Sequence, residues 1–373
     1  MICFLRCATV SEDIRLTKYI QAANARNIPL FALTWDRLGK NEKQDFEIQF
    51  KRSAPFGLRW RNLWNKILWQ FFVIYNLIKF KSNYNVIHAT NFENIFPALL
   101  LKLIFNKKIV YDIYDSTSSD FSNNIFLIII KKLDIFAIKK SDLLVLADEK
   151  RLEQIKIKKS TCKNFLEIEN VPNFQDKVFP INELDMRKIR LSYVGVFDRM
   201  RGLEELLNFV NKNENFVLNI AGTGTLIDLI KNESAKNTRI IYHGLVKYQD
   251  GIEIMRNSDF IIGMYHKKAS NHVYAAPNKF FEALYLAKPL ITTNGTLVGS
   301  KTEKYLTGYT IEESEDDLAF LFNNFIENKS ESIKKYDKVI KNAAQLWNET
   351  YSNYFENRLK NNYINFIISL NEN

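Results

Sequence analysis

The segment APNKFFEALYLAKPLI (276–291) places a cation and an acid at the start of an otherwise apolar helix. Pro277 suits the first helical position, where its missing N–H is not needed. Lys279 is unfavourable near the positive end of the helix dipole, unless a bound phosphate reverses the local charge. Glu282 can accept hydrogen bonds from hydroxyls such as those of a ribose. The alternative is a glutamate favoured by the dipole beside a solvated lysine.

Two other strand-to-helix turns carry residues suited to a diphosphate. In SYVGVFDRMRGLEELL (192–207), a predicted strand ends at Gly195, and Arg199 and Arg201 follow before a helix. Arginines in such a loop can neutralise phosphates. AGTGTL (221–226) is a second glycine-containing turn, where the backbone at Gly222 and Gly224 can approach a ligand. All three elements follow strands, and ligands of open α/β sheets bind at that edge.

Short apolar runs alternate with amphipathic stretches of helical length, which predicts an α/β protein with parallel sheets covered by helices. The predicted strands are 1–7, 29–35, 85–90, 108–114 and 143–148, then 191–197, 216–222, 239–244, 259–265 and 289–295. The predicted helices include 13–26, 59–80, 201–212, 247–257 and 277–287. Prolines interrupt both patterns in 169–186, which we interpret as a hinge between two doubly wound, Rossmann-like domains. We place these domains at 1–178 and 179–345, with 346–373 as a helix returning to the first domain.

Composition narrows the choice of partners. The chain of 373 residues has a formal net charge of +10, which favours a phosphorylated small molecule, a membrane surface or nucleic acid, unless lysine is simply abundant. Its three cysteines form no disulfide or zinc pattern, so we expect a reduced, cytoplasmic environment. The apolar run IFLIII (125–130) is far too short to span a membrane. No nucleic-acid recognition module is recognisable, so we expect no nucleic acid as partner.

The basic, aromatic stretch 58–81 has two interpretations. It is either a helix that contacts a membrane surface or a core helix of the first domain with snorkelling ends. We assign its middle to the core and its basic N-terminal end to a peripheral contact with an anionic membrane at the inner face of the cell membrane.

The order of motifs resembles that of family 4 glycosyltransferases of the GT-B fold. In the second half the matching motifs are YVGVFDRMRGLEELL, LNIAGTGTL, IIYHGLV, NSDFIIGMY and PNKFFEALYLAKPLITT. In the first half, RCATVSEDIR, NVIHATN, KIVYDIYD, SDLLVLAD and ENVPN follow the family order more loosely. The resemblance implies two Rossmann-like domains facing a central cleft, and it covers nearly the whole chain.

Residue by residue, the resemblance implies a nucleotide-sugar site in the second domain. Glu282 matches the glutamate that holds the donor ribose, and Arg201 matches the basic position at the diphosphate. The implied donor-binding residues are Gly195, Arg199, Arg201, Gly222, Gly224, Lys279 and Glu282, and the implied catalytic residues are Asp115, Arg201 and Lys279. The chain departs from the family at three positions, one of which is Tyr114, where members often have a histidine. Val196 replaces an arginine and Tyr274 replaces a glutamate.

Two further kinds of residue could lie at the cleft. Asp115, in DIYDS, either contacts the sugar or acceptor or simply ends a strand. His266 and His272 lie in a loop that can flank the cleft, without the spacing of a metal site. Since no D-x-D motif follows a strand, we expect no catalytic metal and no cofactor beyond the nucleoside diphosphate sugar used as donor substrate.

The motifs and this resemblance therefore predict a metal-independent glycosyltransferase, and the resemblance implies retention at the anomeric carbon. The donor is a nucleoside diphosphate sugar, and the predicted acceptor is a saccharide linked to a polyprenyl diphosphate, in the synthesis of capsule, O-antigen or exopolysaccharide. Two alternatives remain open. A sugar-nucleotide epimerase of the GT-B fold would use the same donor site without an acceptor, and a non-catalytic partner of another transferase would tolerate the changes at Val196 and Tyr274.

Overall fold

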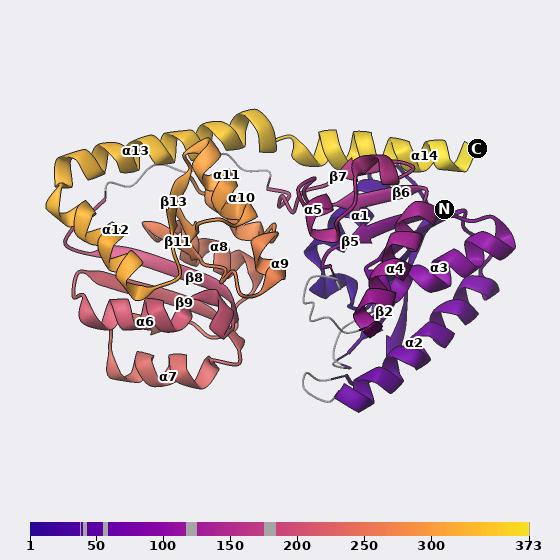
Figure 1. The fold of residues 1–373 in the computed structure, drawn as a ribbon, viewed down its shortest axis with the longest axis horizontal. Helices are drawn as coiled ribbons and strands as arrows, with labels where there is room; N and C mark the ends of the chain where they lie inside the picture. Colours follow the sequence, from indigo (N-terminus) through magenta and orange to yellow (C-terminus); the bar gives the residue numbers. More distant parts are fainter. Residues whose placement is uncertain (38, 40–42, 55–58, 117–124, 175–183, 373) are drawn as a thin grey trace. The chain divides into compact units, whose positions relative to one another are not determined.

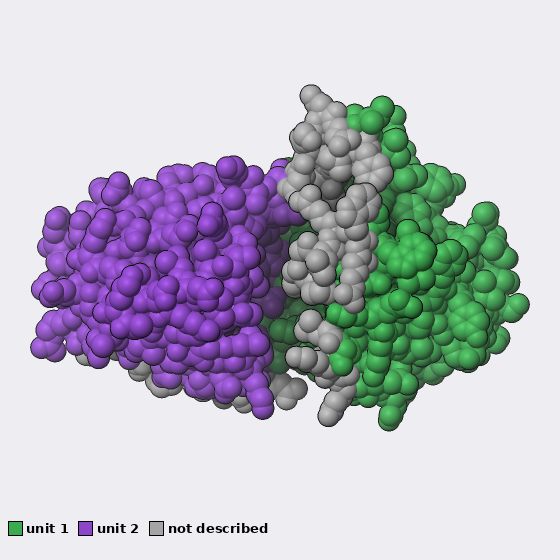
Figure 2. Space-filling view, turned by 90° about the horizontal axis from the view of Figure 1, so that it is seen from below, with its two compact units in different colours: residues 1–173, 353–373 green, residues 174–352 purple. Residues whose placement is uncertain are grey.

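The computed structural model describes residues 1–37, 39, 43–54, 59–116, 125–174 and 184–372. The chain divides into two compact units, Met1–Asn173 with Asn353–Asn373, and Phe174–Ser352, which are coloured separately in Figure 2. Each unit is built on one parallel sheet, so the α/β class predicted from the alternating pattern is confirmed.

The first unit contains a seven-stranded parallel sheet in the order β3-β2-β1-β4-β5-β6-β7 (Figure 1). Its strands are β1 (Ile2–Arg6), β2 (Leu30–Asp36), β3 (Glu47–Lys51), β4 (Val86–Thr90), β5 (Lys108–Ile113), β6 (Leu143–Leu146) and β7 (Phe165–Glu167). The central strands β1, β4, β5 and β6 are buried along nearly their whole length because helices cover both faces. The two edge strands, β3 and β7, were not among the predicted strands.

Helices of the first unit connect these strands by crossovers. They are α1 (Ile14–Asn24), α2 (Arg59–Lys79), α3 (Phe92–Phe105), α4 (Ile125–Lys140) and α5 (Arg151–Ile155). Helix α3 packs between α2 and α4, and the three form one layer of the unit (Figure 1). The buried side of α2 includes Trp69 and Val73, which contact the core, so the prediction that the middle of this helix packs in the core is correct. The basic start of this stretch, 58–61, lies outside the residues or side chains that are described.

The second unit contains a six-stranded parallel sheet in the order β10-β9-β8-β11-β12-β13. Its strands are β8 (Ile189–Phe197), β9 (Phe216–Gly224), β10 (Ile240–Tyr242), β11 (Phe260–Gly263), β12 (Leu290–Thr293) and β13 (Gly308–Ile311). Its helices are α6 (Leu203–Lys212), α7 (Ile227–Lys236), α8 (Tyr248–Arg256), α9 (Ser270–Val273), α10 (Asn278–Tyr285), α11 (Leu297–Tyr305), α12 (Glu315–Glu327) and α13 (Lys329–Leu346). The strand order reverses between β8 and β11, which creates a switch point at the carboxyl edge of the sheet.

The chain continues beyond α13 as helical segments at Trp347–Tyr351 and Phe355–Tyr363, followed by α14 (Ile364–Glu372). Residues 353–373 pack within the first unit. There the Tyr363 hydroxyl lies 2.7 Å from His88 Nδ1, and the Glu169 N–H donates to the Tyr354 hydroxyl oxygen over 2.6 Å. Aromatic side chains at helical spacing therefore serve as the packing face of this segment.

Two further sequence interpretations concern the hinge and a possible membrane span. Half of the predicted hinge, 169–186, consists of residues 175–183, which lie outside the described part of the chain. Among the described residues, no helix is both long and apolar enough to cross a membrane.

Candidate functional site

The switch point of the second unit brings together residues from three separate elements. Strand β8 ends at Phe197, the turn Arg199–Arg201 follows it, and helix α10 begins at Asn278. From these elements Gly195, Arg201, Lys279 and Glu282 reach the same edge of the sheet. Because crevices at such switch points bind ligands in open α/β sheets, this edge is the candidate site.

Lys279 lies across the end of strand β8. Its ammonium donates a hydrogen bond to the Val194 carbonyl and sits 4.2 Å from the centroid of the Tyr193 ring. A Cβ placed on Gly195 would lie 2.9 Å from the Lys279 Nζ, so glycine leaves room for the side chain to cross. Burial lowers the Lys279 pKa to about 8; the Glu282 carboxylate opposes this change and Arg201 adds to it. The site therefore holds an ammonium that a neighbouring anion would stabilise.

Glu282 is one turn further along α10 and is only 6% exposed. Burial raises the pKa of its carboxyl group, against the opposing effects of Lys279 and the Tyr248 phenol. The sequence placed Glu282 at an open helix end, but every residue from Phe280 to Tyr285 is buried. Helix α10 therefore places a buried carboxylate in the unit. Little water competes there for its hydrogen bonds with the hydroxyl groups of a ligand.

The helix start itself differs by one residue from the prediction. Pro277 is the N-cap rather than the first helical residue, and α10 begins at Asn278. Proline has no side-chain acceptor for the free N–H groups of the first turn. The positive end of the helix dipole thus lies beside Lys279, and both attract anions.

The two arginines of the turn occupy different environments. The guanidinium of Arg201 is half-buried and stacks over the Tyr265 ring, with 4.6 Å from its Cζ to the centroid. Arg199 is exposed. The turn is held by the Asp198 side chain, which accepts a hydrogen bond from the Met200 N–H. Only Arg201 of the two is therefore fixed at the position where it influences the pKa of Lys279.

Gly222 and Gly224 lie on β9 opposite the end of β8. Gly222 pairs with Gly195, and a Cβ on Gly222 would lie 1.9 Å from the Gly195 carbonyl oxygen. A Cβ on Gly224 would lie 2.3 Å from the Phe197 carbonyl oxygen. Close packing of the two strands is thus sufficient reason for glycine at both positions. Their predicted approach to a ligand remains a proposal.

Residues that the sequence did not single out frame the two cations. The aromatic rings of Tyr193 and Tyr265 support Lys279 and Arg201, each by a cation–π contact. Burial raises the Tyr265 pKa to about 12, so its hydroxyl stays neutral. Tyr265 lies two residues beyond the end of β11, and its position near a strand end was a signal that could have indicated it. Tyr248, from α8, adds a phenol beside Glu282.

A second polar group lies beside Arg201. His266 Nε2 is 3.9 Å from Glu205 Oε1, and the Nε2 atom is buried without a hydrogen-bond partner among the described residues. Burial and the Arg201 charge lower the pKa of His272 in the same loop. The loop that the sequence placed near the cleft therefore does lie near Arg201, and its histidine at 272 favours the neutral form.

Asp115 belongs to the first unit, just beyond strand β5. It is exposed, and its N–H donates to the Asn91 side-chain oxygen over 3.3 Å. The buried carboxylate nearby is Asp112, which accepts from Arg15 over 2.9 Å and from Tyr19 over 2.8 Å. Burial opposes ionisation of Asp112, but Arg15 and His88 more than offset it and lower its pKa to about 2. Asp112 therefore stabilises the core of the unit, whereas Asp115 is available to a ligand.

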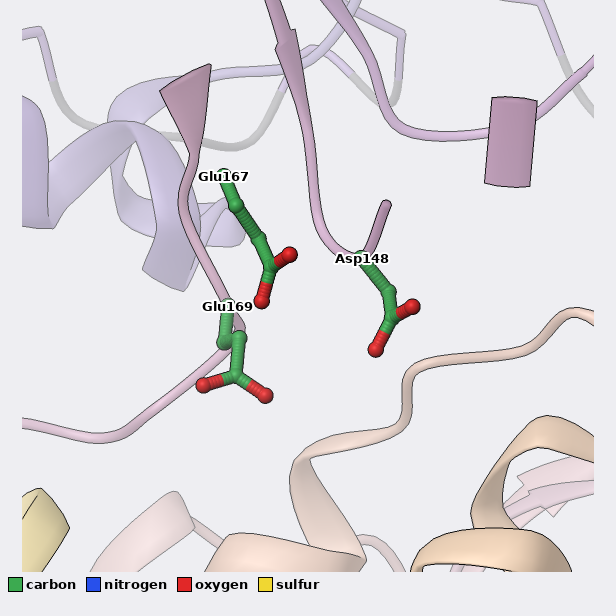
Figure 3. Close-up of side chains that lie close together, drawn as sticks. All are labelled: Asp148, Glu167 and Glu169. Atoms are coloured by element: carbon green, nitrogen blue, oxygen red, sulfur yellow. The ribbon is translucent and has the colours of Figure 1, made fainter. Parts of the chain in front are cut away.

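Three carboxylates of the first unit gather at the ends of β6 and β7. Figure 3 shows Asp148, Glu167 and Glu169 close together, and one carboxylate oxygen from each lies within 4.8 Å of the other two. Carboxylate oxygens are ligands that Mg²⁺ and Ca²⁺ prefer. However, each of the three has polar partners within the chain, such as the Glu149 N–H that donates to Glu167. The group is thus explained without a bound ion.

One protein family matches the part of the chain that contains this site. Residues 174–346 match the family described as glycosyl transferases group 1. The matched residues nearly coincide with the second unit. No curated protein sequence matches the chain.

Solved structures match the chain over nearly its full length. A sucrose-phosphate synthase from Thermosynechococcus elongatus has a TM-score of 0.72 at 12% identity, with 99% of this chain and 100% of that chain covered. The Anabaena protein HepE in complex with UDP and glucose has a TM-score of 0.67 at 13% identity, covering 100% and 99%. A glycosyltransferase from Rickettsia africae has a TM-score of 0.66 at 14% identity, covering 100% and 98%. The fold is therefore GT-B, as predicted, and the findings support a GT-B glycosyltransferase.

Proposed function

We propose that the chain is a glycosyltransferase that moves a sugar from a nucleoside diphosphate sugar to a saccharide acceptor. The observation that carries the proposal is the pairing of Lys279 and Arg201 at the switch point, one from α10 and one from the turn after β8. Two cations held over aromatic rings favour an anionic ligand, and the group 1 match covers the domain that contains them. The HepE structure, a match at the level of fold, was solved with UDP and glucose.

The chemistry of the transfer follows from these residues. The bond between the anomeric carbon and the diphosphate oxygen breaks, and a bond to an acceptor hydroxyl oxygen forms. Negative charge develops on the departing diphosphate oxygen as its bond to the anomeric carbon breaks, and that oxygen takes up the proton of the acceptor hydroxyl. Lys279, Arg201 and the start of α10 stabilise that charge because they are fixed before the reaction begins. Glu282 would hold the ribose hydroxyls and so place the diphosphate against the cations.

Finer features of the proposal follow from the resemblance to family 4 glycosyltransferases. They are retention at the anomeric carbon, independence of metal, and a polyprenyl diphosphate-linked acceptor in surface polysaccharide synthesis at the inner face of the cell membrane. Asp115 would contact the transferred sugar or the acceptor, and Arg199 would add to the charge around the diphosphate. Gly195, Gly222 and Gly224 would line the donor site through their backbone.

Donor binding tests the proposal directly. A thermal-shift panel of UDP-, GDP-, ADP- and CMP-sugars should raise the melting midpoint with one nucleotide class, since a ligand at a hundredfold excess over its Kd stabilises the folded state by about 2.7 kcal/mol. Glu282→Ala should abolish the shift, and Glu327→Ala, at an exposed position on α12, should leave it unchanged. No shift with any of the nucleotides would refute the proposal. A shift accompanied by isomerisation of the donor without acceptor would identify an epimerase.

A further inference from the structure

The layer formed by α2, α3 and α4 has an unusually apolar outer surface, which we call the α2–α4 face. Of the 22 large apolar side chains that are exposed among the described residues, 14 lie on these three helices. Trp64 and Phe71 of α2 are 60% and 66% exposed, Leu103 of α3 is 85% exposed, and Ile125 of α4 is 76% exposed. Exposed apolar patches of this extent on a folded unit indicate an interaction surface.

The apolar side chains form stripes rather than scattered points. On α2 the exposed apolar residues recur at 63, 64, 67, 71, 75 and 78, which places them on one side of the helix. Helix α3 lies between α2 and α4, so the stripes of the three helices are neighbours (Figure 1). The opposite side of each helix packs on the sheet, as Trp69 and Ile138 show. The exposed apolar side chains of the three helices therefore take no part in the core of the unit.

Charge on the same helices is strongly one-sided. Together the helices carry nine Lys and Arg residues against only Glu93 and Asp134, which gives +7 of the chain's net charge of +10. Asp134 is buried, where it accepts a hydrogen bond from Tyr111 over 2.5 Å, and Glu93 is half-buried. No described acidic side chain on these helices is exposed. The face therefore complements a surface that is apolar at depth and anionic at its boundary.

The positions of the lysines agree with such a boundary. Lys79 Nζ lies 6.0 Å from the centroid of the exposed Tyr75 ring, and Lys140 Nζ lies 5.8 Å from that of the exposed Phe136 ring. Cationic heads beside exposed aromatic rings match the composition of helices that lie in a membrane interface. A second copy of the same face would bring like charges together, which disfavours self-association.

We infer that the α2–α4 face is a docking surface for an anionic lipid bilayer, on which the first unit lies without crossing it. The apolar stripes enter the boundary between headgroups and acyl chains, and the flanking lysines contact lipid phosphates. This extends the contact beyond the basic start of the stretch 58–81 to α3 and α4. The inference stands independently of the proposed transfer reaction, because it involves no residue of the donor site.

Vesicle binding by the full chain tests the inference. The protein should co-sediment with phosphatidylcholine vesicles that contain phosphatidylglycerol, and binding should weaken with added salt and with pure phosphatidylcholine. Leu103→Glu should weaken binding at least about tenfold. It removes an apolar side chain that would enter the bilayer, and it introduces a negative charge that the anionic lipid repels. Phe320→Glu is the matched control, since Phe320 is 72% exposed on α12 of the second unit.

The lysine contribution has its own pair of variants. Lys132→Glu, on α4, should weaken binding to anionic vesicles about tenfold, whereas Lys231→Glu, at an exposed position of α7, should not. Thermal melting of each variant checks that the fold is retained.

Three results would overturn the inference. They are no binding of the wild type to anionic vesicles, equal losses in Leu103→Glu and Phe320→Glu, or a dimer in solution that Leu103→Glu dissociates. The last result would assign the face to a second copy of the chain. Nucleotide binding measured on the same variants keeps the two proposals separate, because Leu103→Glu should leave the donor-induced thermal shift unchanged.

Discussion

Donor affinity should fall as pH rises from about 7 to about 9, and Lys279 is the expected cause. In the unliganded unit, burial lowers the pKa of the Lys279 ammonium to about 8 from the ordinary lysine value of 10.5. A diphosphate beside it would favour the charged form and return the pKa to at least its ordinary value. Above pH 8, binding therefore requires Lys279 to take up a proton, and affinity drops as protons become scarce.

The size of the effect follows from proton linkage. With a pKa of about 8 in the free protein and above about 10 in the complex, Kd should rise about tenfold between pH 7 and pH 9, or about 1.4 kcal/mol. Lys279→Met should bind more weakly at pH 7 and lose this pH dependence. Lys231→Met, at an exposed position on α7, should behave as the wild type.

Calorimetric titration with UDP at several pH values gives both quantities in one experiment. The Kd measured at each pH gives the slope of affinity against pH. Titrations in buffers of different ionisation enthalpy give the number of protons taken up on binding, which should approach one per site near pH 9. A wild-type Kd that stays constant over this range, with no proton uptake, would refute the assignment of Lys279 to the diphosphate. The same slope in Lys279→Met would move the titrating group elsewhere.

Two further predictions concern stability. Gly222→Ala should lower the free energy of unfolding by more than about 2 kcal/mol, because its Cβ would lie 1.9 Å from the Gly195 carbonyl oxygen; Gly244→Ala should cost about 1 kcal/mol, since its φ is +76° but no atom lies within 4 Å. Chemical denaturation measures both, and equal losses would contradict the packing argument. Lys18 is buried and donates to the Val171 carbonyl over 2.6 Å, and burial lowers its pKa to about 7. Because unfolding lets Lys18 take up a proton, stability should rise by up to about 3 kcal/mol from pH 6 to pH 9 in the wild type relative to Lys18→Met, and parallel curves would contradict this.

The fold could be predicted from sequence wherever strands are buried on both faces. All ten predicted strands exist, because runs such as Leu143–Leu146 are continuously apolar and Val86–Thr90 is mostly so. The strands that escaped prediction, β3, β7 and β13, lie at sheet edges. Their residues are mostly half-buried, and β3 and β7 also include charges, so neither a continuous apolar run nor a clean alternation marks these strands.

The site was only partly predictable, and the reason lies in distance along the chain. Turn position after a strand indicated Arg201, and the unfavourable charge at a helix start indicated Lys279, because each signal is local. The rings under these cations are not local to them. Tyr265 lies 64 positions from Arg201, and Tyr193 lies 86 positions from Lys279. Such pairings follow from strand order, which no short pattern encodes.

The geometry of the two cations links binding to stability. Burial and the nearby charge of Arg201 disfavour the Lys279 ammonium in the unliganded unit, as its lowered pKa shows. The Val194 carbonyl and the Tyr193 ring offset part of this cost without neutralising the charge. A carboxylate in direct contact would have offset more, but it would also have occupied the position of an anionic ligand. Glu282, itself buried with a raised pKa, limits the positive charge without cancelling it. An unliganded site held in this way keeps part of its electrostatic energy for the ligand, because binding a diphosphate relieves both costs at once.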